Sequence, residues 1–176
     1  GWHYNTGIYE RNGYKSAATV IRQLVDIVSK NGNLLLSIPL RADGTYDEKE
    51  AIILDGIEAW MAVNKESIIG TRPWVKFGEG PVAEKDIKLN AQGFNDGQYS
   101  KMDSRDIRFN QTKKHLYVTP LGWPEDGKVV VKSLAKGNPY FKKGITKVEL
   151  LGFGRLKAVQ TAQGLEVQLP KTDDNI

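Results

Sequence analysis

The chain has 176 residues, of which 25 are Lys or Arg and 21 are Asp or Glu, giving a formal net charge of +4. With 40% hydrophobic and 26% charged residues, its composition is that of a globular protein of one or two domains rather than a disordered chain. No apolar run approaches the length of a membrane-spanning helix, so we expect no membrane partner, and the absence of cysteine excludes disulfides and thiolate chemistry. Gly1–Tyr4 contains neither an initiator Met nor an apolar leader, which indicates a piece of a longer protein.

The first predicted elements are a strand and a helix. The aromatic segment Gly1–Tyr4 is expected to end a strand. Between Ser16 and Lys30 the apolar residues recur with the i, i+4, i+7 spacing of an amphipathic helix. Ser16 is a suitable N-cap, and Asn31-Gly32 provides the left-handed residue that commonly ends a helix.

A second strand and a second helix follow. Leu34–Ile38 is apolar at nearly every position, which is typical of a strand covered on both faces in a parallel sheet. Asp47 and Glu50 resemble a capping box that opens a helix ending near Asn64. The alternation of strands and helices predicts an α/β arrangement with a parallel sheet. Two such units cannot close a (β/α)8 barrel, which needs about 200 residues, so part of that fold must lie outside this chain.

After Trp74 the helical period disappears and short strands separated by Gly and Pro turns are predicted. These strands are Ile87–Leu89, Ile107–Phe109, Leu116–Thr119, Val129–Leu134, Ile145–Leu151, Leu156–Thr161 and Leu165–Leu169. Such a pattern over about a hundred residues predicts an antiparallel β-sandwich. The boundary is expected within Gly70–Pro81, which divides the chain into an α/β part, residues 1–75, and an all-β part, residues 76–176.

The residues present exclude several kinds of chemistry. His3 and His115 are the only imidazoles and are far apart in sequence, so neither a zinc site nor a nucleophilic triad is expected. Phosphate-binding glycine loops are absent, and we expect no cofactor and no metal. The longest basic clusters, Lys113-Lys114 and Lys142-Lys143, are too short for a nucleic-acid-binding surface.

Four carboxylates follow the predicted strand Leu34–Ile38, where barrel enzymes place catalytic groups. They are Asp43, Asp47, Glu48 and Glu50. Glycoside hydrolysis requires a pair of carboxylates, but a turn role for Asp43 and positions near a helix N-terminus for the others explain all four. We therefore favour structural roles for this group.

The aromatic residues near the start offer a possible binding surface. If Gly1–Tyr4 ends a strand, Trp2 and Tyr4 share one face, and aromatic rings stack on the apolar faces of sugars. A role as core aromatics at a domain junction is an equally good interpretation.

Several segments resemble the α-L-fucosidases of glycoside hydrolase family 29. The longest is Asp26–Pro39 (DIVSKNGNLLLSIP) followed by Asp43-Gly44, which resembles the last barrel helix and strand of that family. Further similar segments, in the same order, are Trp2-His3-Tyr4, Trp60, Asn64–Ile68, Gly70–Trp74, Asp106–Phe109, Leu116–Val118 and Gly122–Pro124. The family often has Asn where Ser37 stands and Gly where Lys65 stands.

The resemblance implies the C-terminal part of a retaining exo-α-L-fucosidase: the last two βα units of a (β/α)8-like barrel and a C-terminal β-sandwich. The family's nucleophile lies in a W-x-D context, and both it and the acid/base precede the segment that matches Trp2, so no catalytic residue is assigned here. Trp2 and Tyr4 are the expected substrate-binding residues. The resemblance also implies a fucosylated glycan substrate, association with the missing N-terminal barrel segment, and a secreted, periplasmic or lysosomal location.

Two other functions remain open. The chain can instead be a non-catalytic carbohydrate-binding or interaction module, which exposed, coplanar aromatics such as Phe109, Tyr117 and Trp123 would favour, whereas their burial would favour a scaffold. A barrel hydrolase with another sugar specificity is the third hypothesis. Asn110-Gln111-Thr112 also has the pattern of a glycosylation acceptor.

Overall fold

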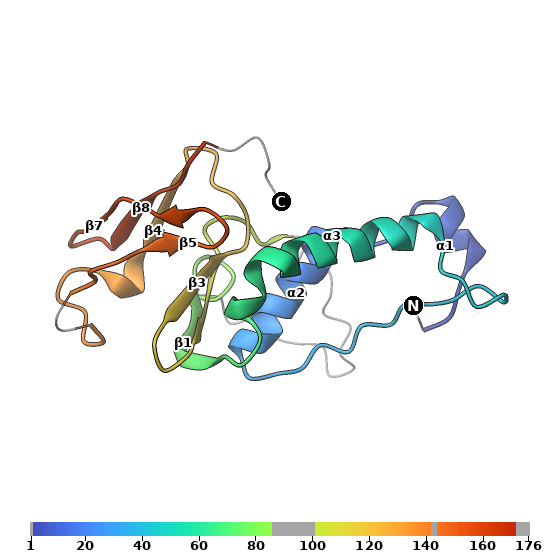
Figure 1. Cartoon of the computed structure of the whole chain (residues 1–176), viewed down its shortest axis with the longest axis horizontal. Helices are drawn as coiled ribbons and strands as arrows, with labels where there is room; N and C mark the ends of the chain where they lie inside the picture. Colours follow the sequence, from blue (N-terminus) through green and yellow to red (C-terminus); the bar gives the residue numbers. More distant parts are fainter. Residues whose placement is uncertain (1, 86–100, 142–143, 172–176) are drawn as a thin grey trace.

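A computed structural model describes residues 2–85, 101–141 and 144–171 of the chain (Figure 1). Its helices lie toward one end of the molecule and its sheets toward the other. The elements are α1 (Thr6–Glu10), α2 (Ala17–Ser29), α3 (Glu48–Asn64), the 3-10 turn η1 (Lys65–Ser67), β1 (Arg72–Glu79), β2 (Ile107–Gln111), β3 (Leu116–Pro120), β4 (Lys128–Val131), the 3-10 turn η3 (Lys132–Leu134), β5 (Glu149–Leu150), β6 (Gly154–Arg155), β7 (Ala158–Gln160) and β8 (Leu165–Gln168). Among the helices described, none combines the length and apolar character needed to cross a membrane.

The two predicted helices are confirmed. Ser16 caps α2 by accepting a hydrogen bond from the Thr19 amide at 3.1 Å, and Asn31 adopts a φ of +66° just after the helix. α2 and α3 pack against each other. The contact is close at Gly56 of α3, because a Cβ there would lie 2.7 Å from the Cβ of Ala17. The short helix α1 was not predicted from the sequence.

The predicted strands in the N-terminal part are wrong for this chain. Trp2–Tyr4 and Leu34–Ile38 form no strand, and no described strand pairs with them. Figure 1 shows the second segment as a trace below α2 and α3 rather than as an arrow. A β-strand depends on hydrogen bonds to a neighbouring strand, and the described chain offers none at this place. The predicted order, a part with helices followed by an antiparallel all-β part, is confirmed, but the described residues form no parallel sheet.

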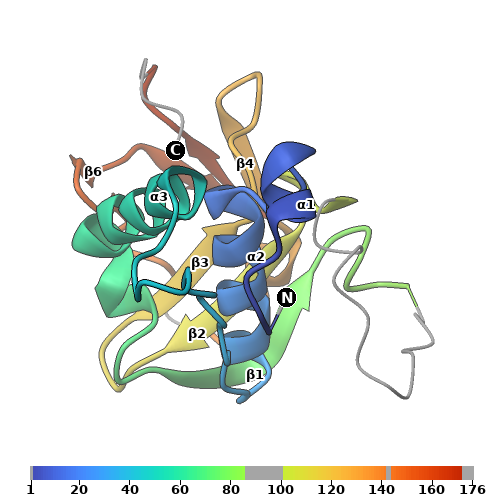
Figure 2. The ribbon, with the colours of Figure 1, turned by 90° about the vertical axis from the view of Figure 1, so that its right-hand side faces the viewer.

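The second part forms antiparallel sheets that pack face to face. One sheet has the order β1-β2-β3, another has the order β4-β8-β7, and β5 and β6 form a two-stranded ribbon (Figures 1 and 2). Ile107 and Phe109 of β2 share one hydrophobic core with residues of β4 and β8. That core comprises Ile107, Phe109, Val129, Val131, Leu134, Leu165 and Val167. The predicted pair of antiparallel layers is therefore present.

The strand predictions differ from the structure in detail. β1 was not predicted, because Pro73 and Gly78 within it resemble loop residues, and its register with β2 shifts between these two positions. Ile145–Leu151 contributes only β5, and the end of Val129–Leu134 turns into η3. The predicted strand Ile87–Leu89 lies outside the described residues.

Strand β2 is buried on both faces. Its apolar side chains face the sheet core, while Arg108 and Asn110 are buried on the other face, with 1% and 2% exposure. α2 contacts both β1 and β2, and Arg108 Nε donates to Asp26 Oδ1 of α2 at 2.5 Å. The Arg108 guanidinium and the Lys30 ammonium both lie over the ring of Phe77 in β1. A buried ion pair thus joins the helices to the sheets.

Replacing Arg108 with Met is expected to destabilise the protein by about 3–5 kcal/mol, because the buried Asp26 carboxylate would lose its buried ion-pair partner. Urea unfolding followed by circular dichroism measures this change. The double variant Asp26→Leu, Arg108→Met should recover most of the loss. Lys30→Ala, which removes a half-exposed partner of the same carboxylate, is the control and should cost at most about 1 kcal/mol. Equal losses in the control and in Arg108→Met would contradict a buried pair as the cause.

Candidate functional site

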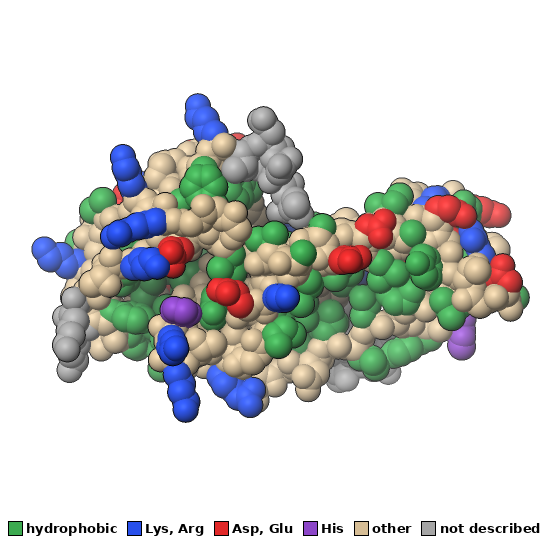
Figure 3. Space-filling model, in the orientation of Figure 1, with side chains coloured by type: hydrophobic (Ala, Val, Ile, Leu, Met, Phe, Trp, Pro, Cys, Tyr) green, Lys and Arg blue, Asp and Glu red, His purple; other side chains and the backbone are tan. Residues whose placement is uncertain are grey.

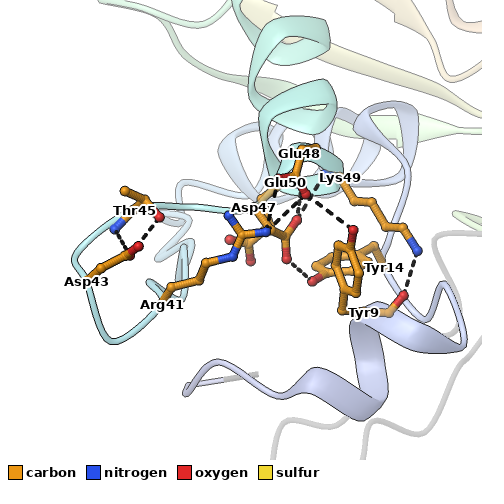
Figure 4. A network of polar contacts seen from close by, with 9 residues as sticks. All are labelled: Tyr9, Tyr14, Arg41, Asp43, Thr45, Asp47, Glu48, Lys49 and Glu50. Atoms are coloured by element: carbon orange, nitrogen blue, oxygen red, sulfur yellow. Dashed lines mark hydrogen bonds and ion pairs between the residues drawn. The ribbon is translucent and has the colours of Figure 1, made fainter.

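A network of polar side chains surrounds the N-terminus of α3 (Figure 4). Its residues come from the segment around α1, from the loop that precedes α3, and from the first turn of α3. We call it the rim cluster, and it comprises Tyr9, Tyr14, Arg41, Asp43, Thr45, Asp47, Glu48, Lys49 and Glu50. It contains all four of the carboxylates that the sequence suggested as candidates.

Asp43 has the turn role expected for it. Its Oδ1 accepts hydrogen bonds from the Thr45 amide at 3.0 Å and from the Thr45 hydroxyl at 2.7 Å. These two bonds lower the pKa of Asp43 below its usual range. Gly44, inside the turn, has a φ of +83°, a conformation that favours glycine. The carboxylate is therefore occupied in holding the loop.

Asp47 is a buried helix cap. It is fully buried, and its Oδ1 accepts from the amides of Lys49 and Glu50, each at 2.9 Å. Its other oxygen accepts a short hydrogen bond from the Tyr14 hydroxyl. Burial acts to raise the pKa of Asp47, but the hydrogen bonds from Tyr14, Glu50 and Lys49 outweigh burial and leave it lowered. Burial, followed by the same bond to Asp47, raises the pKa of Tyr14.

Glu48 and Arg41 connect the rim cluster to the first residues of the chain. Arg41 Nη2 donates to both carboxylate oxygens of Glu48, at 3.1 and 3.0 Å, and the Tyr9 hydroxyl donates to Oε2 at 3.3 Å. Hydrogen bonds to Tyr4 and then to Glu48 raise the pKa of Arg41. Tyr4 therefore lies in contact with the rim cluster, which the sequence spacing alone did not indicate.

Glu50 differs from the other three carboxylates. Its side chain is 7% exposed, and Oε2 has no hydrogen-bond partner among the described residues. Burial, followed by repulsion from Asp47, raises the pKa of Glu50. A buried carboxylate normally has hydrogen-bond partners, so this oxygen is the one unexplained acceptor of the rim cluster.

The two expected substrate-binding aromatics have different surroundings. Trp2 is 73% exposed, whereas Tyr4 is half-buried beside Arg41. In this chain Trp2 is thus available for contact and is not a core residue. His3 is exposed, and His115 makes an edge contact with the Tyr117 ring.

The aromatics of the sheets do not form a flat platform. Phe109 is fully buried and packs edge-on against Trp74, while Tyr117 and Trp123 are half-buried. Asn110 of the glycosylation pattern is also buried, and its Nδ2 donates to the Ser67 carbonyl at 3.1 Å. The folded chain therefore leaves no room for a glycan at Asn110.

Comparison with known proteins agrees with this arrangement. A family model described as alpha-L-fucosidase matches residues 1–66, and a second, the alpha-L-fucosidase C-terminal domain, matches residues 101–176. Human plasma alpha-L-fucosidase is 27% identical over 173 residues, which cover 97% of this chain and 31% of that protein. The alpha-L-fucosidase of Dictyostelium discoideum is 26% identical over 177 residues, covering 100% of this chain and 32% of the relative.

Solved structures give the same result. An alpha-L-fucosidase of 25% identity superposes with a TM-score of 0.68, covering 96% of this chain and 32% of that structure. Thermotoga maritima alpha-fucosidase, solved in complex with fucose, is 26% identical with a TM-score of 0.61, covering 89% of this chain and 31% of that one.

The first match is to a glycosidase family and the second is to the C-terminal domain of the same family, and they follow one another in this order along the chain. The chain belongs to the α-L-fucosidase family. It spans about 30% of the length of the curated relatives that it matches.

Replacing Glu50 with Gln is expected to stabilise this chain at pH 7. A raised pKa means that the folded chain binds the Glu50 proton more tightly than the unfolded chain does. The unsubstituted chain therefore loses stability as the pH rises above about 4.3, the pKa in the unfolded chain, and through the raised pKa of the folded chain. Gln mimics the neutral acid, so the gain should vanish below about pH 4. Urea unfolding at several pH values measures it, with Glu58→Gln on α3 as the control. An equal gain for Glu50→Gln at all pH values would contradict a charge effect.

Proposed function

We propose that this chain is the C-terminal portion of a retaining exo-α-L-fucosidase, which hydrolyses terminal α-linked L-fucose from glycans. The observation that carries the proposal is the match of two fucosidase domains in their order along one chain, joined by a structural similarity that covers nearly all of it. A crystal structure of a related protein, the Thermotoga maritima fucosidase, contains fucose, which supports a fucosylated substrate.

The catalytic carboxylates are proposed to lie on polypeptide outside this chain. A retaining glycosidase needs two carboxyl groups about 5–5.5 Å apart across the scissile bond. In the rim cluster, Asp43, Asp47 and Glu48 are engaged by hydrogen bonds that hold the loop, cap α3 and pair with Arg41. Glu50 is buried. Within the described residues these side chains serve the framework of a site rather than its chemistry.

The surface that would receive this additional polypeptide carries exposed apolar side chains. On the extended segment, Leu35 is 79%, Leu36 39% and Leu40 52% exposed, and Ile52 of α3 is 69% exposed. Figure 3 shows hydrophobic side chains gathered over the α3 side of the molecule. Exposed aliphatic groups together with an unpaired backbone segment are typical of a surface that another chain segment covers.

We propose that the remaining barrel covers this surface. Pairing with its strands would turn Leu34–Ile38 into the last strand of a (β/α)8-like barrel, and a donor from it would satisfy Glu50 Oε2. The proposed division into a barrel part, residues 1–75, and a sandwich, residues 76–176, falls within β1. Because β1 pairs with β2 from Arg72 onward, the sandwich sheet begins a few residues before that division.

The sugar contact is proposed for Trp2 and Tyr4. Trp2 presents an exposed ring two residues before Tyr4, which contacts Arg41 of the rim cluster. An aromatic ring at this rim would stack on the apolar face of a sugar.

The chain alone is expected to release no nitrophenol from 4-nitrophenyl α-L-fucoside, whereas co-expression with the preceding barrel segment of the parent should restore hydrolysis. Leu35→Asp should abolish the restored activity and the co-elution of the two pieces on size-exclusion chromatography, because it buries a charge at the proposed contact. The matched control is Val159→Asp on β7, where the parent side chain is 64% exposed. Robust hydrolysis by the purified chain alone would contradict the proposal.

In the restored enzyme, Trp2→Ala is expected to raise KM roughly tenfold with little change in kcat, because stacking supplies binding of about 1 kcal/mol or more. Trp2→Phe retains a ring and should recover most of the affinity. Steady-state kinetics on the nitrophenyl fucoside distinguish the two variants, and an unchanged KM in Trp2→Ala would remove Trp2 from the sugar site.

A further inference from the structure

The all-β part contains a cavity that none of the residues discussed for fucose hydrolysis lines. It has a volume of about 370 Å³ and lies between the turn that precedes β4 and the segment that follows β8. We call it the Trp123 cavity, and its main lining residues are Trp123, Pro124, Asp126, Gln168, Leu169 and Pro170.

The two walls of the Trp123 cavity are tied together by backbone hydrogen bonds. The Gly127 amide donates to the Pro124 carbonyl at 3.0 Å, which closes the turn, and the Leu169 amide donates to the Gly127 carbonyl at 2.8 Å. Gly127 has a φ of +67°, a left-handed conformation that favours glycine. The cavity is therefore formed before any ligand arrives.

Trp123 supplies an aromatic ring to the lining of the cavity. Trp123 is half-buried and belongs to neither hydrophobic cluster of the described residues, although Trp74 and Leu169 pack on the sheet core. Its indole makes no hydrogen bond to the described residues. A large ring that does not contribute to a core, at the edge of a cavity, is available to stack on a ligand.

Polar residues from both segments line the cavity and include fixed acceptors and donors. Asp126 Oδ1 accepts from the Lys128 amide at 2.9 Å, which orients the carboxylate. Gln168 Nε2 donates to the Gly127 carbonyl at 3.0 Å, so its amide is likewise held. Glu125 and Lys171 also line the cavity and are exposed. Carboxylates and amides beside an aromatic ring match a ligand with several hydroxyl groups and one apolar face.

We propose that the Trp123 cavity binds one neutral sugar residue. Its volume is at the lower end of the roughly 300–1,000 Å³ of small-molecule sites, which suits a single ring rather than an extended chain. The lining contains two carboxylates and one lysine, so its negative charge disfavours a phosphate or sulfate. Its polar groups disfavour a purely apolar ligand. The remaining class is a polyhydroxylated ring stacked on Trp123. The inference is independent of fucose hydrolysis, because it concerns binding by the all-β part.

The test uses the full chain, ¹⁵N-labelled, titrated with lactose, 2′-fucosyllactose and L-fucose while amide and indole NMR signals are followed. Weak binding, with a Kd on the order of 1 mM, is expected for at least one sugar, with shifts confined to the indole of Trp123 and to amides of Asp126, Gly127 and Gln168. Trp123→Ala should weaken it at least about tenfold, and Trp123→Phe should retain most of it.

Control variants separate this site from the others. Val159→Ala, at an exposed position of β7 outside the cavity, should leave the affinity unchanged, and Gln168→Ala, at an exposed position, should lower it without loss of fold. If Trp123→Ala does not fold, Gln168→Ala and Asp126→Asn carry the test instead. Absence of shifts up to tens of millimolar sugar, equal binding by the cavity variants and the parent, or saturation of the cavity by a lysine-rich peptide rather than by sugar would each overturn the proposal. If the chain binds sugar at the cavity but co-expression with the barrel segment restores no hydrolysis, only the proposed activity is contradicted.

Discussion

The ion pair between Asp26 and Arg108 sets the relation between the helices and the sheets. Both groups are almost fully buried, and a buried charge is tolerated only when a partner of opposite sign holds it. Arg108 alternates along β2 with residues that fill the sheet core, so its guanidinium must leave the opposite face. α2 covers that face, and Asp26 is the residue that meets it. This pair fixes the position of α2 relative to β2.

The same arrangement explains why the described N-terminal part forms helices but not the parallel sheet predicted for it. α2 packs against α3, β1 and β2, and α3 packs against α2, so both helices have neighbours within this chain. Leu34–Ile38 pairs with no described strand, and Leu35 is exposed. Helices satisfy their own backbone hydrogen bonds, whereas a strand depends on a second strand. Within the described residues, α2 and α3 are therefore formed while Leu34–Ile38 stays unpaired.

In the rim cluster, carboxylates at a position where barrel enzymes place catalytic groups have structural roles instead. Asp43, Asp47 and Glu48 each accept hydrogen bonds that hold the loop or the start of α3. Glu48 also holds Arg41, which contacts Tyr4. Glu50 is the exception, since its buried Oε2 points to a donor that these residues do not supply.

The sequence by itself determined the elements that depend on local interactions. The apolar period and the cap Ser16 define α2, the cap Asp47 opens α3, and the order of the motifs placed the chain in its family. It could not determine β1, whose Pro73 and Gly78 resemble loop residues, or the contact of Tyr14 with Asp47 across 33 positions. The tertiary structure alone decided that Leu34–Ile38 is no strand here, because pairing is a property of neighbours. It also decided that Asn110 is buried and that Trp123 lies at a cavity, since burial depends on which distant segments meet.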